Sequence, residues 1–280
     1  MQSFRGHSEG IIKVVFHPTG KSFVTIARDN QIKLWNLSGK LLKSWQLYEK
    51  DNQSVLNRIQ DISFSKDGRY LATISGIDAK VKLWDLAGNL VRSWQSKDKL
   101  LTAIDFKQDD KNLVTAGGKT IKLWSIQGEL LQTISGHEDN ILSVKFSPDG
   151  KLIATASLDN KVKIWDSRNG KLLRTLTHSN AVYSLSFSPD SQLLISNSGD
   201  RVYFWNMDGQ LLHSMQSDEG KMLEVGFSQN EKLINLINDK NQITTWNLDI
   251  DDLQQHSCNW FQDYLKINNN LNRNNLDIGC

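Results

Sequence analysis

Short runs of alternating apolar and polar residues recur along the chain, and turn-forming residues separate them. The pattern is clearest in residues 136–170, where Ile141–Phe146 alternates with the two-residue period of a half-buried β-strand. Leu152–Ala156 is a second apolar run, and Lys161–Trp165 and Lys171–Leu176 follow as a third and a fourth. The Pro, Gly and Asn residues between the runs supply turn dihedrals. This unit therefore predicts four short strands.

The four-strand unit repeats along most of the chain. A Trp ends the third predicted strand of each repeat, and a Phe ends the first. Successive Trp residues are 40 or 41 residues apart, except that 49 separate the first two. A period of this length with four strands indicates an all-β repeat fold in which neighbouring units bury one another's apolar faces. The positions are Trp35, Trp84, Trp124, Trp165, Trp205 and Trp246, with Phe16, Phe64, Phe106, Phe146, Phe187 and Phe227 in step.

The repeat resembles that of the WD40 β-propeller family, whose blades are four-stranded sheets. As in that family, Gly136-His137 opens the unit and Trp165-Asp166 closes its third strand. The resemblance implies an all-β propeller of about six four-stranded blades over residues 1–253. It also implies a hydrogen-bonded structural tetrad in blade four, formed by His137, Ser157, Asp159 and Trp165.

The other blades depart from this pattern. Blade one has Asp29 at the turn position of the tetrad, but Ala27 stands where the second-strand hydroxyl is expected. Blade two has an enlarged lead-in, Leu47 to Arg58, and blades three and six have lost the turn Asp. Blade five keeps His178, but its second turn is one residue short. The sequence thus predicts one complete tetrad, with strand packing carrying most of the stability.

The beginning of the chain allows two interpretations. Gln2–Arg5 aligns with Lys43–Gln46, the end of a fourth strand, and Gly6-His7 follows as it would between blades. In WD40 propellers the first stretch often completes the last blade, which closes the ring and removes a sheet edge. Alternatively, the chain is a fragment of a longer repeat protein, cut within a blade.

Residues 254–280 form a tail of different composition. Trp260, Phe261, Tyr264 and Leu265 have the spacing of one face of a short helix, which we expect to dock on the last blade. Asn268–Asn275, six of whose eight residues are Asn, is expected to stay mobile. The stretch DDLQQHSCNWFQDYL resembles the tail of many bacterial WD40-repeat proteins. In that group the repeats often follow a signalling NTPase or kinase domain.

Composition narrows the class of partner. The chain has 33 basic and 31 acidic residues, a net charge of +2, which gives no electrostatic reason to expect nucleic acid or an anionic membrane surface. No apolar run is long enough to span a bilayer, and the first residues, MQSFRGHSEG, lack the apolar region that a signal peptide is expected to have. Both cysteines, Cys258 and Cys280, lie in the tail, so we expect a cytoplasmic protein without a disulfide framework.

The sequence offers no catalytic, cofactor or metal motif. Gly20-Lys21-Ser22 and Gly118-Lys119-Thr120 resemble the end of a phosphate-binding loop, but Val15 and Leu113 stand where its first Gly is required. The His and Cys spacings match no metal site, and no nucleophile elbow is present. We therefore expect no cofactor and no metal.

Two sets of surface residues are candidates for binding. Lysines two residues before the blade Trp (Lys33, Lys82, Lys122 and Lys163) could bind an anion, but we expect solvated strand ends. The resemblance implies that partners bind the loops before the first strand and between the second and third strands. The candidate partner-binding residues there are Arg28, Ile77, Leu158, Glu9, Asp139 and Asn140.

The sequence therefore predicts a non-catalytic WD40 scaffold that binds protein partners and is monomeric if its ring closes. If the chain derives from a longer signalling protein, the scaffold is its sensor or regulatory part. One alternative is a propeller enzyme with a loop-built site at the mouth of the central channel. Another is a fragment of a longer repeat array with no present partner.

Overall fold

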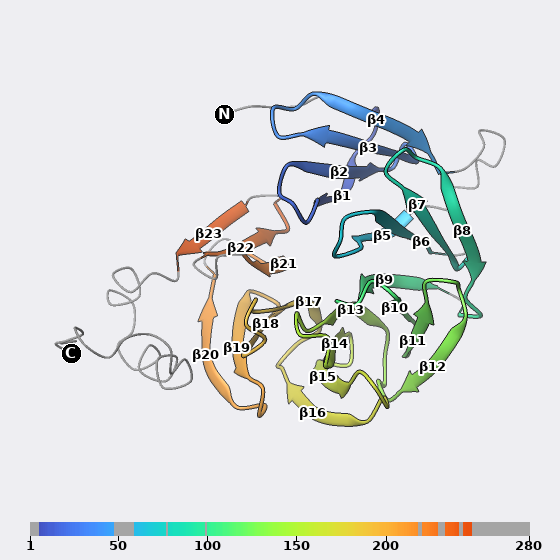
Figure 1. Ribbon diagram of the computed structural model, residues 1–280. Coiled ribbons are helices and arrows are strands. Elements are labelled where there is room, and N and C mark those ends of the chain that lie inside the picture. The colour runs from blue at the N-terminus through green and yellow to red at the C-terminus, as the bar shows by residue number, and fades with distance from the viewer. Residues whose placement is uncertain are drawn as a thin grey trace, which may run out of the picture. The chain divides into compact units, whose positions relative to one another are not determined.

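A computed structural model describes residues 6–47, 59–76, 78–98, 100–217, 220–228, 233–240 and 243–247. All regular secondary structure in these ranges is β-strand. The strands form six antiparallel sheets, each made of strands consecutive in the chain (Figure 1). Five sheets have four described strands and the sixth has three. The all-β class and the six repeats are thus confirmed, and each sheet is called a blade, numbered in chain order.

The strand bounds follow the predicted repeats closely. Blade by blade they are β1 (Ile11–Phe16), β2 (Ser22–Ala27), β3 (Gln31–Asn36) and β4 (Leu41–Gln46); β5 (Ile59–Phe64), β6 (Tyr70–Ser75), β7 (Lys80–Asp85) and β8 (Leu90–Gln95); β9 (Leu101–Phe106), β10 (Asn112–Gly117), β11 (Thr120–Ser125) and β12 (Leu130–Ser135); β13 (Ile141–Phe146), β14 (Leu152–Ser157), β15 (Lys161–Asp166) and β16 (Leu172–Thr177); β17 (Val182–Phe187), β18 (Leu193–Ser198), β19 (Arg201–Asn206) and β20 (Leu211–Gln216); and β21 (Met222–Phe227), β22 (Leu233–Asn238) and β23 (Ile243–Asn247).

Three predictions fall on other parts of the chain. The closing strand at Gln2–Arg5 and the helical, mobile tail at 254–280 lie outside the described residues. Of the enlarged lead-in to blade two, only Leu47 is described.

The chain divides into two compact units. The first comprises Met1–Phe146 with Ser167–Gly170, and the second comprises Ser147–Asp166 with Lys171–Cys280. In the first unit the opening strands of successive blades pack together in the order β1, β5, β9 and β13, and in the second β17 packs against β21. The first strand of each blade thus belongs to an inner row, and β13 of blade four lies in the first unit although its other strands belong to the second.

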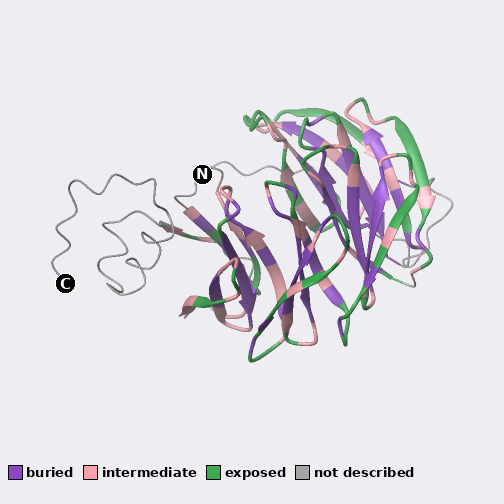
Figure 2. Ribbon diagram, turned by 60° about the horizontal axis from the view of Figure 1, so that its bottom comes forward, coloured by how far each residue is buried: buried purple, intermediate pink, exposed green. Residues whose placement is uncertain are grey.

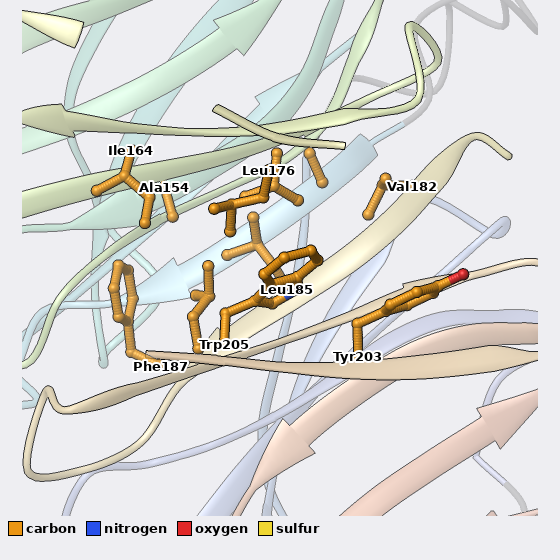
Figure 3. Close-up of a cluster of buried hydrophobic side chains, with 11 residues drawn as sticks. Ala154, Ile164, Leu176, Val182, Leu185, Phe187, Tyr203 and Trp205 are labelled. Carbon is orange, nitrogen blue, oxygen red and sulfur yellow. The ribbon is translucent and has the colours of Figure 1, made fainter. Parts of the chain in front are cut away.

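The apolar core of each unit lies between neighbouring blades. In the second unit, side chains from β14, β15 and β16 meet those from β17 and β19, with Phe187 and Trp205 among the largest (Figure 3). In the first unit, Ile32 and Ile62 belong to one such cluster, and Leu83 belongs to the next. The outermost strands, such as β4 and β8, are mostly exposed, as the green ribbons of Figure 2 indicate. Because each blade buries both faces of its inner strands, the apolar runs of the sequence are explained.

The turn after the first strand requires a left-handed residue. Gly20 and Gly68 supply it in blades one and two, with φ near 70°, but Asp110 takes the same conformation in blade three. The Asp110 carboxylate accepts hydrogen bonds from the backbone N–H groups of Lys66 and Asp67, in the matching turn of blade two. A strained backbone is therefore offset by contacts between blades.

Candidate functional site

A complete hydrogen-bonded tetrad anchors the loops of blade one. The Thr25 hydroxyl lies 2.8 Å from the Trp35 indole nitrogen and 2.7 Å from His7 Nε2. His7 Nδ1 lies 3.0 Å from the Asp29 carboxylate, which can only accept, so Nδ1 donates. Burial alone would raise the pKa of Asp29, but hydrogen bonds from the Ser8 backbone N–H and from His7 outweigh it and lower that pKa. The tetrad fixes the loop before β1 against the turn between β2 and β3.

The hydroxyl of this tetrad is not where the sequence analysis placed it. The sequence pattern places the position at Ala27 in blade one and at Ser157 in blade four. In the structure the Trp35 indole donates to Thr25, and the Trp165 indole donates to Thr155 over 3.0 Å. Trp165 lies opposite Ile153 in the sheet, so Thr155 is its diagonal neighbour on the same face. Ser157 is two residues further along the strand, about 7 Å away, beyond the reach of the indole.

The same rule holds in all five blades whose Trp meets a hydroxyl. In each of these blades the Trp pairs with a residue of the second strand, and the hydroxyl belongs to the residue two positions after that partner. This holds whatever the length of the turn between the second and third strands. In blade six that position holds Leu236, which is buried. The remaining pairs are Trp84 with Thr73, Trp124 with Thr115 and Trp205 with Ser196, at 2.9 to 3.0 Å.

The other predicted tetrad residues of blade four shape its turn. The Ser157 hydroxyl accepts a hydrogen bond from the Asp159 backbone N–H at 3.1 Å, and the Asp159 carboxylate accepts one from the Lys161 N–H at 3.0 Å. His137, Ser157 and Trp165 are all buried. Ser157 is therefore reassigned from the indole to the turn.

Blade five keeps a shorter network around a buried histidine. His178 Nε2 lies 2.8 Å from the Ser196 hydroxyl, which also accepts from the Trp205 indole, and Nδ1 lies 3.3 Å from the Leu176 carbonyl. Burial lowers the pKa of His178 to about 4, so the ring is neutral at physiological pH. With Nδ1 as donor to the carbonyl, Nε2 accepts the Ser196 proton. This histidine has a structural role.

The lysines before the blade Trp are not solvated strand ends. Lys33 donates to the Gly6 carbonyl and Lys82 to the Leu47 carbonyl, the latter over 2.6 Å. The lysine of blade three, Lys122, is buried and lies 2.8 Å from an Asp98 carboxylate oxygen. Burial lowers the pKa of Lys82. The prediction of solvated strand ends is wrong. These lysines lie on the third strand, which is flanked by the second and fourth strands of its blade. The ammonium groups of Lys33, Lys82 and Lys122 contact the segment that precedes a first strand.

Two buried aspartates that the sequence analysis did not single out join the inner strands of the first unit. Asp61 on β5 accepts from the Ile104 backbone N–H at 3.0 Å and pairs with Lys13 at 2.5 Å. Asp105 on β9 accepts from the Phe146 N–H at 2.9 Å. An acidic residue within a first strand was the signal that the sequence offered. Each carboxylate links one blade to the next.

The predicted partner-binding residues have different surroundings. Glu9 and Arg28 are exposed, and the Arg28 backbone N–H donates to the Gly10 carbonyl at 3.0 Å, which brings their two loops together. Asp139 and Asn140 are exposed in the loop before β13, also in the first unit. Leu158 is half-buried in the β14–β15 turn of the second unit, and Ile77 lies outside the described residues.

Other kinds of site find no support in the part of the chain that the structure describes. No three His, Cys, Asp or Glu side chains gather there as metal ligands would. Nor do those residues include a helix that could cross a membrane.

Comparisons with known proteins agree with this architecture. The family model described as the IFT122 first beta-propeller matches residues 100–261. The model described as WD domain, G-beta repeat, matches residues 1–36 and 52–85. A search of curated proteins found no match.

Proposed function

The chain belongs to the WD40-repeat β-propeller family, and from this we propose that it is a non-catalytic interaction module that holds protein partners on the loops before the first strands and between the second and third strands. These loops are called the lead-in face. WD40 propellers generally mediate contacts between proteins.

One observation carries the proposal: the blade-one tetrad holds the lead-in loops in place while their neighbouring side chains point to solvent. Thr25 and Trp35 are buried, yet Glu9 and Arg28 beside the tetrad are exposed. Neither Glu9 nor Arg28 forms an ion pair with another described residue. A rigid loop that displays unpaired polar side chains loses little conformational entropy on binding a partner.

We further propose that this module is the sensor or regulatory part of a cytoplasmic signalling protein. The resemblance of the tail to those of bacterial signalling proteins supports this role. The balanced charge and the placement of both cysteines in the tail support the location.

Affinity capture from the native cell extract tests the proposal. A lead-in variant, Glu9→Lys with Arg28→Glu, keeps the net charge and should lose proteins that the wild-type chain retains. The control, Lys21→Glu with Glu129→Lys, exchanges two exposed charges in turns at the other end of the blades and should retain them. Equal retention by both variants, or no specific capture by the wild type, would overturn the proposal.

A further inference from the structure

We propose that the lead-in loop of blade three is a docking site for an acidic peptide segment that carries an apolar residue. The site consists of Lys97, Leu100 and Lys119, which are called the Leu100 patch. It rests on the proposed function and names the chemistry of one partner.

The patch is built from two segments that are held together. Asp98 of the lead-in loop accepts a hydrogen bond from the Thr120 hydroxyl at 3.3 Å and pairs with Lys122 at 2.8 Å. Lys97 and Lys119 immediately precede the two bonded residues, Asp98 and Thr120. The two exposed lysines are thus presented by loops whose backbones are fixed.

Glycines leave the Leu100 side chain uncovered. A Cβ on Gly117 would lie 2.7 Å from the Leu100 carbonyl oxygen, so only glycine allows the lead-in loop to approach this turn. A Cβ on Gly76, in blade two, would lie 3.2 Å from Leu100 Cδ1. The Leu100 side chain thus lies against Gly76 and is 39% exposed.

Acidic residues adjoin the patch. Asp98 pairs with Lys122 at 2.8 Å, and Asp78 lies 3.9 Å from Lys80. The acidic loop before β13 also lies beside the turn that carries Lys119, because the Ile141 N–H donates to the Gly118 carbonyl at 2.8 Å. Lys97 and Lys119 form no ion pair with any described residue. An exposed apolar side chain on the same loop as one unpaired cation, with a second unpaired cation on the turn bonded to that loop, is complementary to a segment in which acidic residues flank a Leu, Ile or Phe.

The patch differs in charge from the loops predicted to bind partners. Glu9 and Arg28 balance each other in blade one, and Asp139 makes the loop before β13 acidic. An acidic segment would therefore be steered to blade three in preference to its neighbours.

Fluorescence anisotropy with a short labelled peptide of Asp and Glu around a central Leu tests the site. We expect saturable binding that weakens as salt rises, and no binding of the same peptide with Lys in place of its acidic residues. Lys97→Glu with Lys119→Glu should weaken binding by at least about tenfold, and Leu100→Ser by several-fold. The control Lys21→Glu should leave it unchanged, and thermal unfolding should show all variants folded.

Absence of peptide binding, or binding equally strong in the Lys97→Glu/Lys119→Glu variant, would overturn this inference. Such a result leaves the interaction module standing if extract proteins are still captured through the lead-in face. Conversely, loss of all specific capture would remove the proposed function whatever the peptide does.

Discussion

Replacing Thr25 with Val tests the assignment of the blade-one tetrad. Valine keeps the shape of the buried side chain but removes the hydroxyl that lies 2.8 Å from Trp35 Nε1 and 2.7 Å from His7 Nε2. The indole N–H and the imidazole nitrogen would both stay buried without a partner. Each such group costs about 1–3 kcal/mol, so for the two groups the free energy of unfolding should fall by roughly 2–6 kcal/mol.

Thr73→Val is the matched control. Thr73 is buried in the same position of blade two, and among the described residues its hydroxyl accepts a hydrogen bond from the Trp84 indole alone, at 3.0 Å. Thr73→Val should lower the free energy of unfolding by about 1–3 kcal/mol. Thr25→Val should lower it further, because it also removes the hydrogen bond to His7. Urea unfolding of both variants, provided that the m-value is unchanged, gives the difference between their free energies of unfolding. If Thr25→Val costs no more than Thr73→Val, the bond between His7 and Thr25 contributes nothing and the tetrad assignment fails.

Three further changes test other parts of the structure. The folded pKa of His178, about 4, lies below its unfolded value of 6.5, so the unfolded chain binds more protons between these values and stability should fall by roughly 3 kcal/mol as pH drops from 6.5 to 4. His178→Gln should reduce this slope in urea titrations at several pH values and leave the part due to His213, whose pKa burial also lowers; an unchanged slope would contradict the role of His178. Asp110→Gly relieves the left-handed strain but removes two hydrogen bonds to a carboxylate, and calorimetry should show a net loss of about 1–2 kcal/mol; a gain would mean that strain dominates. Gly88→Ala places a Cβ 3.1 Å from the Trp45 ring at φ +85°, so the melting temperature should fall by an amount equivalent to about 1–3 kcal/mol; an unchanged value would contradict the close contact.

The repeat, its strand bounds and the fold class could be predicted because they depend on local information. A Trp, a Phe and a turn signal recur at fixed offsets, and apolar runs between them suit strands that are covered on both faces. Glu9 and Arg28 are exposed, and their part in binding a partner stays a prediction.

The details that failed depend on pairing across the sheet. Counting back from the turn Asp selected Ala27 and Ser157, whereas the indole selects Thr25 and Thr155 by strand register. The number of residues between hydroxyl and Trp varies with the turn, but the register does not. A count along the chain therefore cannot find the hydroxyl unless the pairing is known.

Interactions between blades were also beyond the sequence. In the sequence Lys82 resembles a solvated lysine at a strand end, but in the structure it donates to the carbonyl of Leu47, directly after β4. Asp61 accepts a hydrogen bond from a backbone N–H of β9. Both contacts join residues that are 35 and 43 positions apart. Their partners follow from tertiary packing and not from local propensity.

Site-specific photo-crosslinking in the native cells tests most directly whether the lead-in face binds proteins. A photoreactive side chain replaces Asn140 in one variant and Lys21 in the other; both positions are exposed, at opposite ends of the blades. The proposed function predicts a discrete protein adduct from position 140 and none from position 21. Equal adducts from both positions, or adducts only from position 21, would contradict it.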